Sequence, residues 1–137
     1  EPLLVRLPED MRADVLAEVR HVREAPALAA LFGPDARAEV SVAGVLGTNK
    51  VFGRVDRIVR QPDHILIVDF KSNRVIPSSP DQTPEAVLRQ MAAYRAVLTP
   101  AFPGQRIDVA IVWTAAARLD ILPHDLVNAA LERAALS

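Results

Sequence analysis

Cysteine is absent from the 137 residues of this chain, which excludes disulfides, thiolate zinc sites, iron–sulfur clusters and a cysteine nucleophile. No apolar run is long enough to span a membrane, and no signal peptide is visible. No glycine-rich phosphate loop is present, so the chain itself does not predict ATP binding. Together these absences are typical of a cytoplasmic protein, and we expect that location.

Histidine is scarce, and its three copies show no metal-ligand spacing. They are His21, His64 and His124, and we assign none of them to a metal. No serine has the histidine and aspartate partners that would indicate acyl transfer. The sequence therefore does not predict a histidine-based metal site or a serine hydrolase.

A strong excess of positive charge is also missing, since the net charge is −1. The charge is unevenly spread, however: residues 1–39 hold five arginines and eight acids, whereas residues 50–74 hold six bases and three acids. A locally basic centre can hold phosphate even in a neutral domain. The alternative is that these mixed charges only solvate the surface.

The order of apolar patterns predicts an α/β (α+β) fold, with a mixed central sheet flanked by helices. The almost continuous apolar run before Asp69 favours a central strand covered on both faces. Thr83 is the expected N-cap of the helix that follows the polar loop over residues 72–83. The expected helices cover residues 9–24, 27–32 and 84–98, and a last helix begins at residue 123. The expected strands cover residues 39–46, 51–60, 65–71, 106–114 and 118–122.

The length fits one domain over residues 1–137. We divide it into a helical lead-in (1–34), a core (39–122) and a C-terminal helix (123–137). Because the chain starts at Glu1 rather than Met, we expect a fragment or a processed product, and we assign it to the C-terminal part of a larger protein.

Asp69 and Lys71 lie two residues apart at the end of the apolar strand, so they share a face. An aspartate can ligate Mg²⁺, and a lysine can orient a water or steady the charge on a phosphate. The pair therefore predicts a small polar site at the strand's end. The alternative is a surface ion pair where the strand emerges into solvent.

Asp56 strengthens the first interpretation. If the neighbouring strands form an antiparallel hairpin about Pro62 and Asp63, Asp56 lies opposite Asp69. Two adjacent carboxylates repel one another unless a cation lies between them or one is protonated, so a divalent metal is the simplest occupant. Alternation would place Phe52, Arg54, Asp56 and Ile58 on one face. The alternative for Asp56 is an exposed residue paired with Arg54 or Arg57.

Three further residues are candidates for the same site. Glu39 begins the preceding strand, as a further ligand or a solvated acid. Gln90 and Tyr94 lie four apart on a helix and share a face, where an amide and a hydroxyl can contact a nucleic-acid backbone. The alternative is a helix edge with a buried tyrosine ring.

These motifs, in this order, resemble the RecB-type nuclease family of the PD-(D/E)xK superfamily over roughly residues 39–114. The wider sequence is similar to the C-terminal nuclease domain of AddA-type helicase–nuclease subunits, which act in bacterial double-strand break repair. The motifs are Glu39, Gly53-Arg54-Val55-Asp56-Arg57-Ile58, Val68-Asp69-Phe70-Lys71-Ser72, and Gln90 to Tyr94 as Q-x-x-x-Y.

The resemblance implies a metal-dependent deoxyribonuclease. Asp56 and Asp69, with the Phe70 backbone carbonyl and Glu39 in support, would hold Mg²⁺ or Mn²⁺, and Lys71 would act on the attacking water. The expected DNA-contacting residues are Gln90, Tyr94, Arg54, Arg57 and Arg74.

The resemblance also implies partners: the ends of double-stranded DNA, single strands after unwinding, an AddB-like subunit, and an ATP-dependent helicase in the same parent protein. One family feature is missing, because RecB-type enzymes place a metal-binding histidine in an earlier helix. His21 lacks the expected context, and we expect the equivalent upstream of Glu1.

Two alternatives remain from the sequence. The first is a catalytically silent DNA-binding or scaffolding domain. The second, a relative of the CRISPR-associated RecB-like nucleases, is disfavoured by the lack of cysteine.

Overall fold

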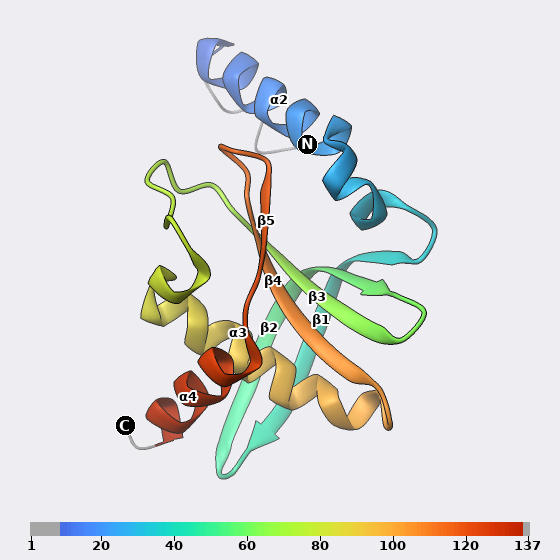
Figure 1. Ribbon diagram of the computed structural model, residues 1–137, viewed down its shortest axis with the longest axis vertical. Helices are drawn as coiled ribbons and strands as arrows, with labels where there is room; N and C mark the ends of the chain where they lie inside the picture. Colours follow the sequence, from blue (N-terminus) through green and yellow to red (C-terminus); the bar gives the residue numbers. More distant parts are fainter. Residues whose placement is uncertain (1–8, 136–137) are drawn as a thin grey trace.

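The apolar strand that precedes Asp69 lies at the centre of a five-stranded sheet in the computed structural model, which describes residues 9–135 (Figure 1). The strands follow one another across the sheet in chain order. β3 and β4 are parallel and the other neighbours antiparallel, which confirms the predicted mixed sheet. The strands are β1 (Ala36–Leu46), β2 (Asn49–Arg60), β3 (His64–Lys71), β4 (Arg106–Trp113) and β5 (Arg118–Ile121).

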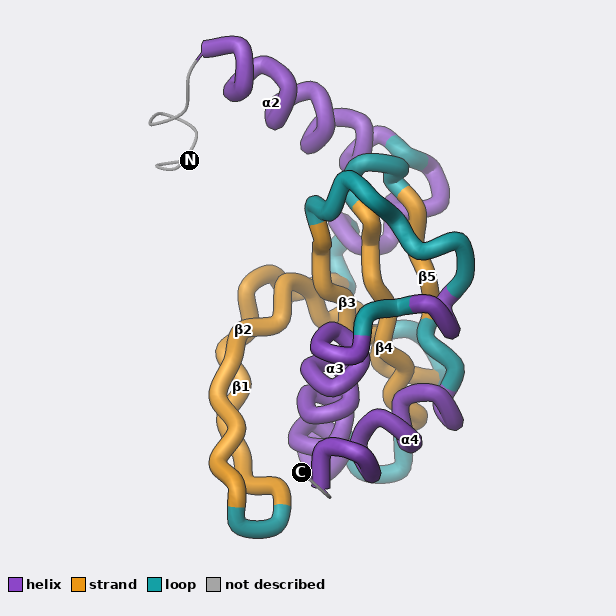
Figure 2. Tube along the Cα trace, turned by 90° about the vertical axis from the view of Figure 1, so that its left-hand side faces the viewer, coloured by secondary structure: helices purple, strands orange, loops and turns teal. Residues whose placement is uncertain are grey.

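Helices cover both faces of the sheet. One face packs against α3 (Glu85–Leu98) and α4 (His124–Ala135), and the other against η1 (Pro26–Phe32) and the end of α2 (Glu9–Glu24). Figure 2 shows the rest of α2 projecting beyond the sheet. Two short 3₁₀ turns, η2 (Pro80–Gln82) and η3 (Thr99–Ala101), flank α3.

The predicted lead-in and C-terminal helix are described from residue 9 and to residue 135, and their remaining residues lie outside the described part. Within residues 9–135, no helix combines the length and apolar character that crossing a membrane requires.

β3 is buried on both of its faces, as its continuous apolar run predicts. Ile65 and Ile67 belong to the core beneath α3 and α4, while Leu66 and Val68 belong to the core beneath η1. All four are at most 5% exposed. Alternate side chains of β3 therefore pack into two different cores. Asp69, the first polar residue after this apolar run, lies on the α3 side at the edge of the core.

The alternation in β2 is interrupted next to Asp56. Val55 and Ile58 both belong to the core under α3, although residues three apart in a regular strand point to opposite faces. Glu39, which lies across from Asp56 between the pairs Ala38↔Arg57 and Val40↔Val55, has a φ of 53°. This left-handed residue marks where the hairpin changes face.

The expectation that Phe52, Arg54, Asp56 and Ile58 share one face is therefore wrong. Phe52 is 75% exposed and the Arg54 side chain 65% exposed, because both lie before the interruption and face away from α3. Asp56 and Ile58 lie after it and face the α3 side.

The start of α3 also differs from the prediction. Its N-cap is Pro84, and no side chain caps it. The Thr83 hydroxyl instead donates a hydrogen bond to the Pro80 carbonyl at 2.6 Å, which closes the short turn η2. Thr83 is 5% exposed, so burial and the local turn outweigh its capping preference.

Candidate active site

The last residues of β3 bring a carboxylate and an amine together. Asp69 is only 6% exposed, and its Oδ2 lies 2.8 Å from the Lys71 Nζ. The Lys71 side chain is 24% exposed, so the pair lies at the border between core and solvent. The ion pair that was the alternative interpretation is thus present, but it is largely buried rather than on the surface.

Asp56 joins this pair from β2. The observed register pairs Arg57 with Val68 and Ile58 with Ile67, and its continuation sets Asp56 across from Asp69 as the hairpin arithmetic predicts. The Phe70 backbone N–H donates a hydrogen bond to the Asp56 Oδ2 at 2.8 Å. This bond fixes the Asp56 carboxylate over the end of β3.

The electrostatics of the pair favour a bound cation. Burial, followed by a hydrogen-bonding contact with the Asp56 carboxyl, raises the pKa of Asp69 to about 6, although Lys71 acts in the opposite direction. A positive charge between two neighbouring carboxylates relieves their repulsion and favours the ionised form of Asp69. The donor set therefore fits a hard divalent cation with oxygen ligands.

A chain of polar contacts runs from Lys71 into α3. The Lys71 Nζ donates to the Gln90 Oε1 at 3.1 Å, and the Gln90 Nε2 donates to the Tyr94 hydroxyl at 3.3 Å. Tyr94 is 6% exposed, and a Cβ added at Gly53 would overlap its hydroxyl and ring. The buried tyrosine ring of the alternative interpretation is present, and both side chains belong to the contacts around Lys71. Their assignment as DNA contacts stays a prediction.

Gly53 leaves the space that the Tyr94 ring occupies, which the sequence does not reveal. It begins the motif that runs to Ile58, yet only the closeness of β2 to α3 shows why this residue is small. A glycine inside a strand pattern is the available signal, because it often marks a close approach.

Glu39 does not join the carboxylates. Its side chain is 70% exposed, and its Oε1 lies 4.0 Å from the Arg54 Nη1, on the outward side of the hairpin. Among the residues that the structure describes, no group of three or more His, Cys, Asp or Glu is arranged to hold a metal. The assignment of the Phe70 carbonyl as a ligand stays a prediction.

The predicted DNA-contacting arginines lie in separate places. Arg57 is held on the face opposite Asp69, with its guanidinium carbon 5.2 Å from the Phe32 ring centre and 5.5 Å from that of Phe70. Its Nε donates to the Leu31 carbonyl at 3.1 Å. Arg57 therefore ties η1 to the sheet.

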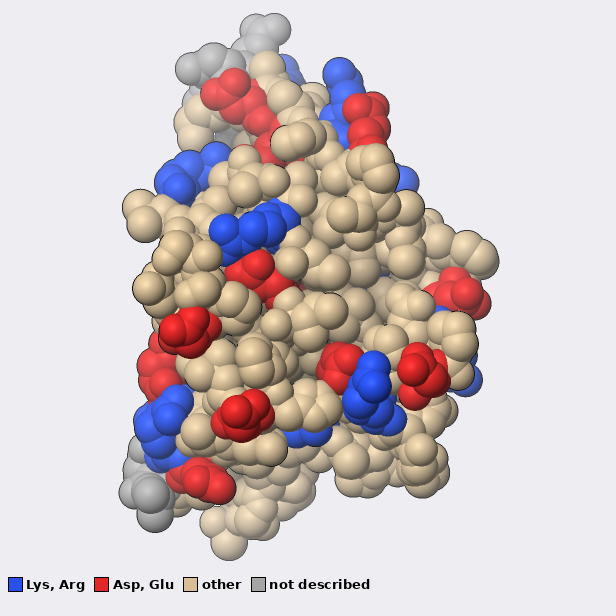
Figure 3. Space-filling model, viewed as in Figure 1, with Lys and Arg blue, Asp and Glu red and all other residues tan. Residues whose placement is uncertain are grey.

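Arg74 pairs with Glu18 of α2 at 2.8 Å, and Arg54 faces outward from the hairpin. Figure 3 shows basic and acidic side chains in small mixed groups on the face in view, with no broad basic patch there. The three predicted DNA-contacting arginines of the basic segment 50–74 are thus dispersed in space.

Glu18 is a second residue near the site that the sequence patterns did not predict. Its Oε2 accepts hydrogen bonds from the Thr114 hydroxyl at 2.6 Å and from the Arg74 Nη2 at 3.0 Å. Burial raises the pKa of Glu18, but these hydrogen bonds outweigh it and leave the pKa below its usual value. Thr114 also donates to the Lys71 carbonyl at 3.2 Å, so α2 is anchored beside the candidate site.

A separate polar cluster lies at the opposite end of the parallel strands. The Asp108 carboxylate lies 2.7 Å from the His124 Nε2, 3.7 Å from the His64 Nε2 and 3.3 Å from the Arg106 Nε. The two histidines are far apart in sequence and meet only because β3 and β4 are parallel. The cluster joins the start of the sheet to α4.

Comparisons with known proteins identify the superfamily and the fold. A model of the PD-(D/E)XK nuclease superfamily matches residues 4–125. The crystal structure of a protein titled "Putative exonuclease", from Eubacterium rectale, is similar at a TM-score of 0.62 and 16% identity, covering 90% of this chain and 48% of that one. The structure of SSO0001 aligns at a TM-score of 0.42 and 15% identity, covering 88% of this chain and 70% of that one.

No curated protein sequence matches the chain. The chain spans about half the length of the Eubacterium rectale structure. At this level of identity, the likeness to solved structures concerns the fold.

Proposed function

Because the chain belongs to the PD-(D/E)XK nuclease superfamily, we propose that it hydrolyses phosphodiester bonds of DNA with the help of Mg²⁺ or Mn²⁺. One observation carries the proposal. Asp56 from β2 and Asp69 and Lys71 from β3 converge at a single, partly buried point, with Asp69 and Lys71 2.8 Å apart. A carboxylate pair beside an amine is the minimum that metal-assisted attack of water on a phosphate requires.

In this proposal Asp56 and Asp69 hold the cation, with the Phe70 carbonyl as a further oxygen ligand. When bound, such an ion polarises the phosphoryl oxygen and stabilises charge on the leaving oxygen. The hydrogen bond from the Phe70 N–H keeps one oxygen of Asp56 in place, so this carboxylate is preorganised before any ion arrives.

Lys71 is the residue that positions the attacking water. Its ammonium has three N–H donors, of which one points to Asp69 and one to Gln90. The remaining donor can hold the water, and the positive charge counters the charge that develops on the phosphate. Gln90 and Tyr94 keep the ammonium in this position.

We further propose that the chain is the exonuclease domain of an AddA-like helicase–nuclease that acts in the cytoplasm on DNA ends during double-strand break repair and recombination. The motif set supports this assignment, and the printed name of the Eubacterium rectale protein supports its exonuclease part alone. ATP-driven unwinding, an AddB-like partner and single-stranded substrate would then belong to the parent protein.

A second candidate is a scaffold that keeps the nuclease fold and binds DNA without cutting it. It is favoured by one observation, namely that no third carboxylate or histidine joins Asp56 and Asp69 among the described residues.

Cleavage of linear DNA separates the two candidates. We expect cutting that requires Mg²⁺ or Mn²⁺ and that falls by roughly a hundredfold or more in Asp69→Ala and in Lys71→Ala. Lys50→Ala, which changes the other lysine of the chain at the exposed hairpin end, is the matched control and should cut normally. Metal-dependent cutting that survives both site changes would contradict the proposed site, and DNA binding without cutting would favour the scaffold.

A further inference from the structure

A pocket of about 510 Å³ lies at the far end of α3 from Gln90, and the assigned site does not use it. Its floor and wall are apolar, formed by Ile58, Ile65, Leu98 and Phe102. Ile58 and Ile65 lie on the same face of the sheet as Asp56 and Asp69, further along the same two strands. We call it the Arg37–Arg60 pocket, after the two basic residues that line it.

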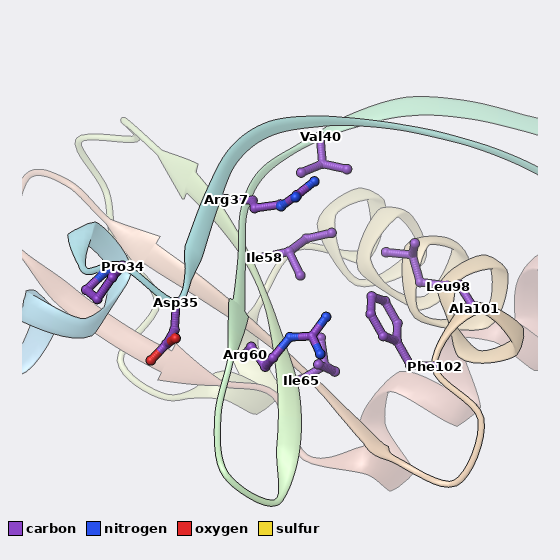
Figure 4. Close-up of a pocket in the computed structure, with 10 residues that line it drawn as sticks. All are labelled: Pro34, Asp35, Arg37, Val40, Ile58, Arg60, Ile65, Leu98, Ala101 and Phe102. Atoms are coloured by element: carbon purple, nitrogen blue, oxygen red, sulfur yellow. The ribbon is translucent and has the colours of Figure 1, made fainter.

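Both guanidiniums project over this apolar floor. Figure 4 shows Arg37 of β1 and Arg60 of β2 extending toward the end of α3, on either side of Ile58. No ion pair or side-chain hydrogen bond joins either guanidinium to another residue in the part of the chain described. Asp35 also lines the pocket, but its carboxylate points away from both of them in Figure 4.

Two unpaired guanidiniums beside an apolar bed suit a particular ligand chemistry. Guanidinium forks match the oxygens of a phosphate, and they do so better than an ammonium. The half-buried ring of Phe102 offers a surface on which a nucleobase can stack. A phosphate with an attached base satisfies both features, whereas an acidic peptide would use only the charges.

We propose that the Arg37–Arg60 pocket binds a backbone phosphate and the adjoining base of the DNA strand, away from the point of cleavage. This inference rests on the proposed function. Arg60 is four residues along β2 from Asp56, or about 13 Å.

Binding of a labelled single-stranded oligonucleotide, measured by fluorescence anisotropy in EDTA, tests the pocket without any cleavage. In Arg37→Ala/Arg60→Ala we expect affinity to fall about tenfold or more at low salt, and the slope of log Kd against log salt concentration to fall by roughly two. Arg12→Ala/Arg20→Ala removes the same charge from α2 and is the control, with a change below about twofold. Thermal unfolding of each variant shows whether the fold is kept.

Phe102→Leu separates stacking from charge. It removes the ring but keeps an apolar side chain, so we expect about fivefold weaker binding or more with an unchanged salt slope. Arg37→Lys/Arg60→Lys should keep most of the salt slope while losing affinity, because it retains charge without the fork.

Unchanged oligonucleotide affinity in Arg37→Ala/Arg60→Ala would overturn the inference. The inference would also be overturned if the double variant lost binding only to a glutamate-rich peptide, because that result would indicate a protein-docking surface. A wild-type chain that does not bind the oligonucleotide would overturn it as well. A wild-type chain that binds DNA through the two arginines, but does not cut it with Mg²⁺ or Mn²⁺, overturns the proposed function and leaves the pocket standing.

Discussion

Asp69 is buried beside a second carboxyl group, Asp56. Ionisation of Asp69 therefore lowers the stability of the folded, metal-free chain, and a bound cation can offset this loss. The folded chain keeps the proton of Asp69 up to a pKa of about 6, whereas the ordinary value of an aspartate is 3.8. Between these values the folded state binds more protons than the unfolded state. The stability of the metal-free chain should therefore fall as the pH rises across this interval.

We predict that Asp69→Asn is more stable than the wild-type chain in EDTA at pH 7 to 8, by roughly 1–3 kcal/mol, and that the difference shrinks toward pH 4. The amide is neutral and so escapes both burial of charge and repulsion from Asp56. Thermal unfolding between pH 4 and 8 measures the effect, and Asp14→Asn on the exposed part of α2 is the control. An Asp69→Asn variant that is less stable at pH 8 would show that the ion pair with Lys71 dominates.

Gly53 is a second residue whose function depends on its neighbour. In Gly53→Ala the new methyl group would displace Tyr94, and with it Gln90 and Lys71. We predict a loss of stability of roughly 1–3 kcal/mol together with a clear drop in kcat for DNA cleavage.

Gly44→Ala is the matched control, because its new methyl group meets Val97 at the far end of α3, away from Lys71. It should destabilise the chain to a similar extent while kcat at a permissive temperature stays near the wild-type value. Equal loss of kcat in both variants would mean that the contact chain through Tyr94 does not position Lys71.

At the scale of elements, the hairpin of β1 and β2 is the feature that sequence patterns describe only in part. Counting outward from the turn sets Asp56 against Asp69 correctly, since the pairs Arg57↔Val68 and Ile58↔Ile67 lie in the same register. A short turn between adjacent strands leaves few registers to choose from. The change of face at Glu39 was not predictable, because no glycine or asparagine marks the left-handed position.

We predict that Glu39→Gly keeps metal-dependent cleavage and raises stability by about 0.5–1 kcal/mol, because glycine adopts a positive φ without steric cost. Glu39→Val should destabilise the chain, since a β-branched residue is strained there. Chemical denaturation and the cleavage assay measure both. A well-folded Glu39→Gly variant that no longer cuts would restore Glu39 as a ligand.

Contacts between distant elements account for what else the sequence did not reveal. Glu18 reaches Thr114 across 96 positions of the chain, and His64 meets His124 through Asp108. Neither has a local pattern, because the link between the parallel strands β3 and β4 passes through α3 and two loops. The mixed sheet and the Asp56–Asp69–Lys71 group were predictable because each depends on local periodicity and a single tight turn.

At the scale of the whole molecule, the candidate site joins β2, β3 and α3, so occupancy of the site should stabilise the entire domain. We predict that Mg²⁺ in about hundredfold excess over its Kd raises the free energy of unfolding by about 2.7 kcal/mol. The shift should disappear in Asp56→Asn/Asp69→Asn. Differential scanning calorimetry measures it, with KCl of equal ionic strength as the control, and an equal shift in both proteins would place the cation elsewhere.

The change of face between Val55 and Asp56 also affects how β2 tolerates substitution. Before it, odd-numbered positions such as Gly53 and Val55 face α3, and after it even-numbered positions such as Asp56 and Ile58 do. In saturation mutagenesis of this strand, the positions that do not tolerate substitution should thus change from odd-numbered to even-numbered at one point. The two adjacent positions 55 and 56 should both be intolerant. Related chains aligned by hydrophobic alternation alone would be shifted by one residue on one side of that step.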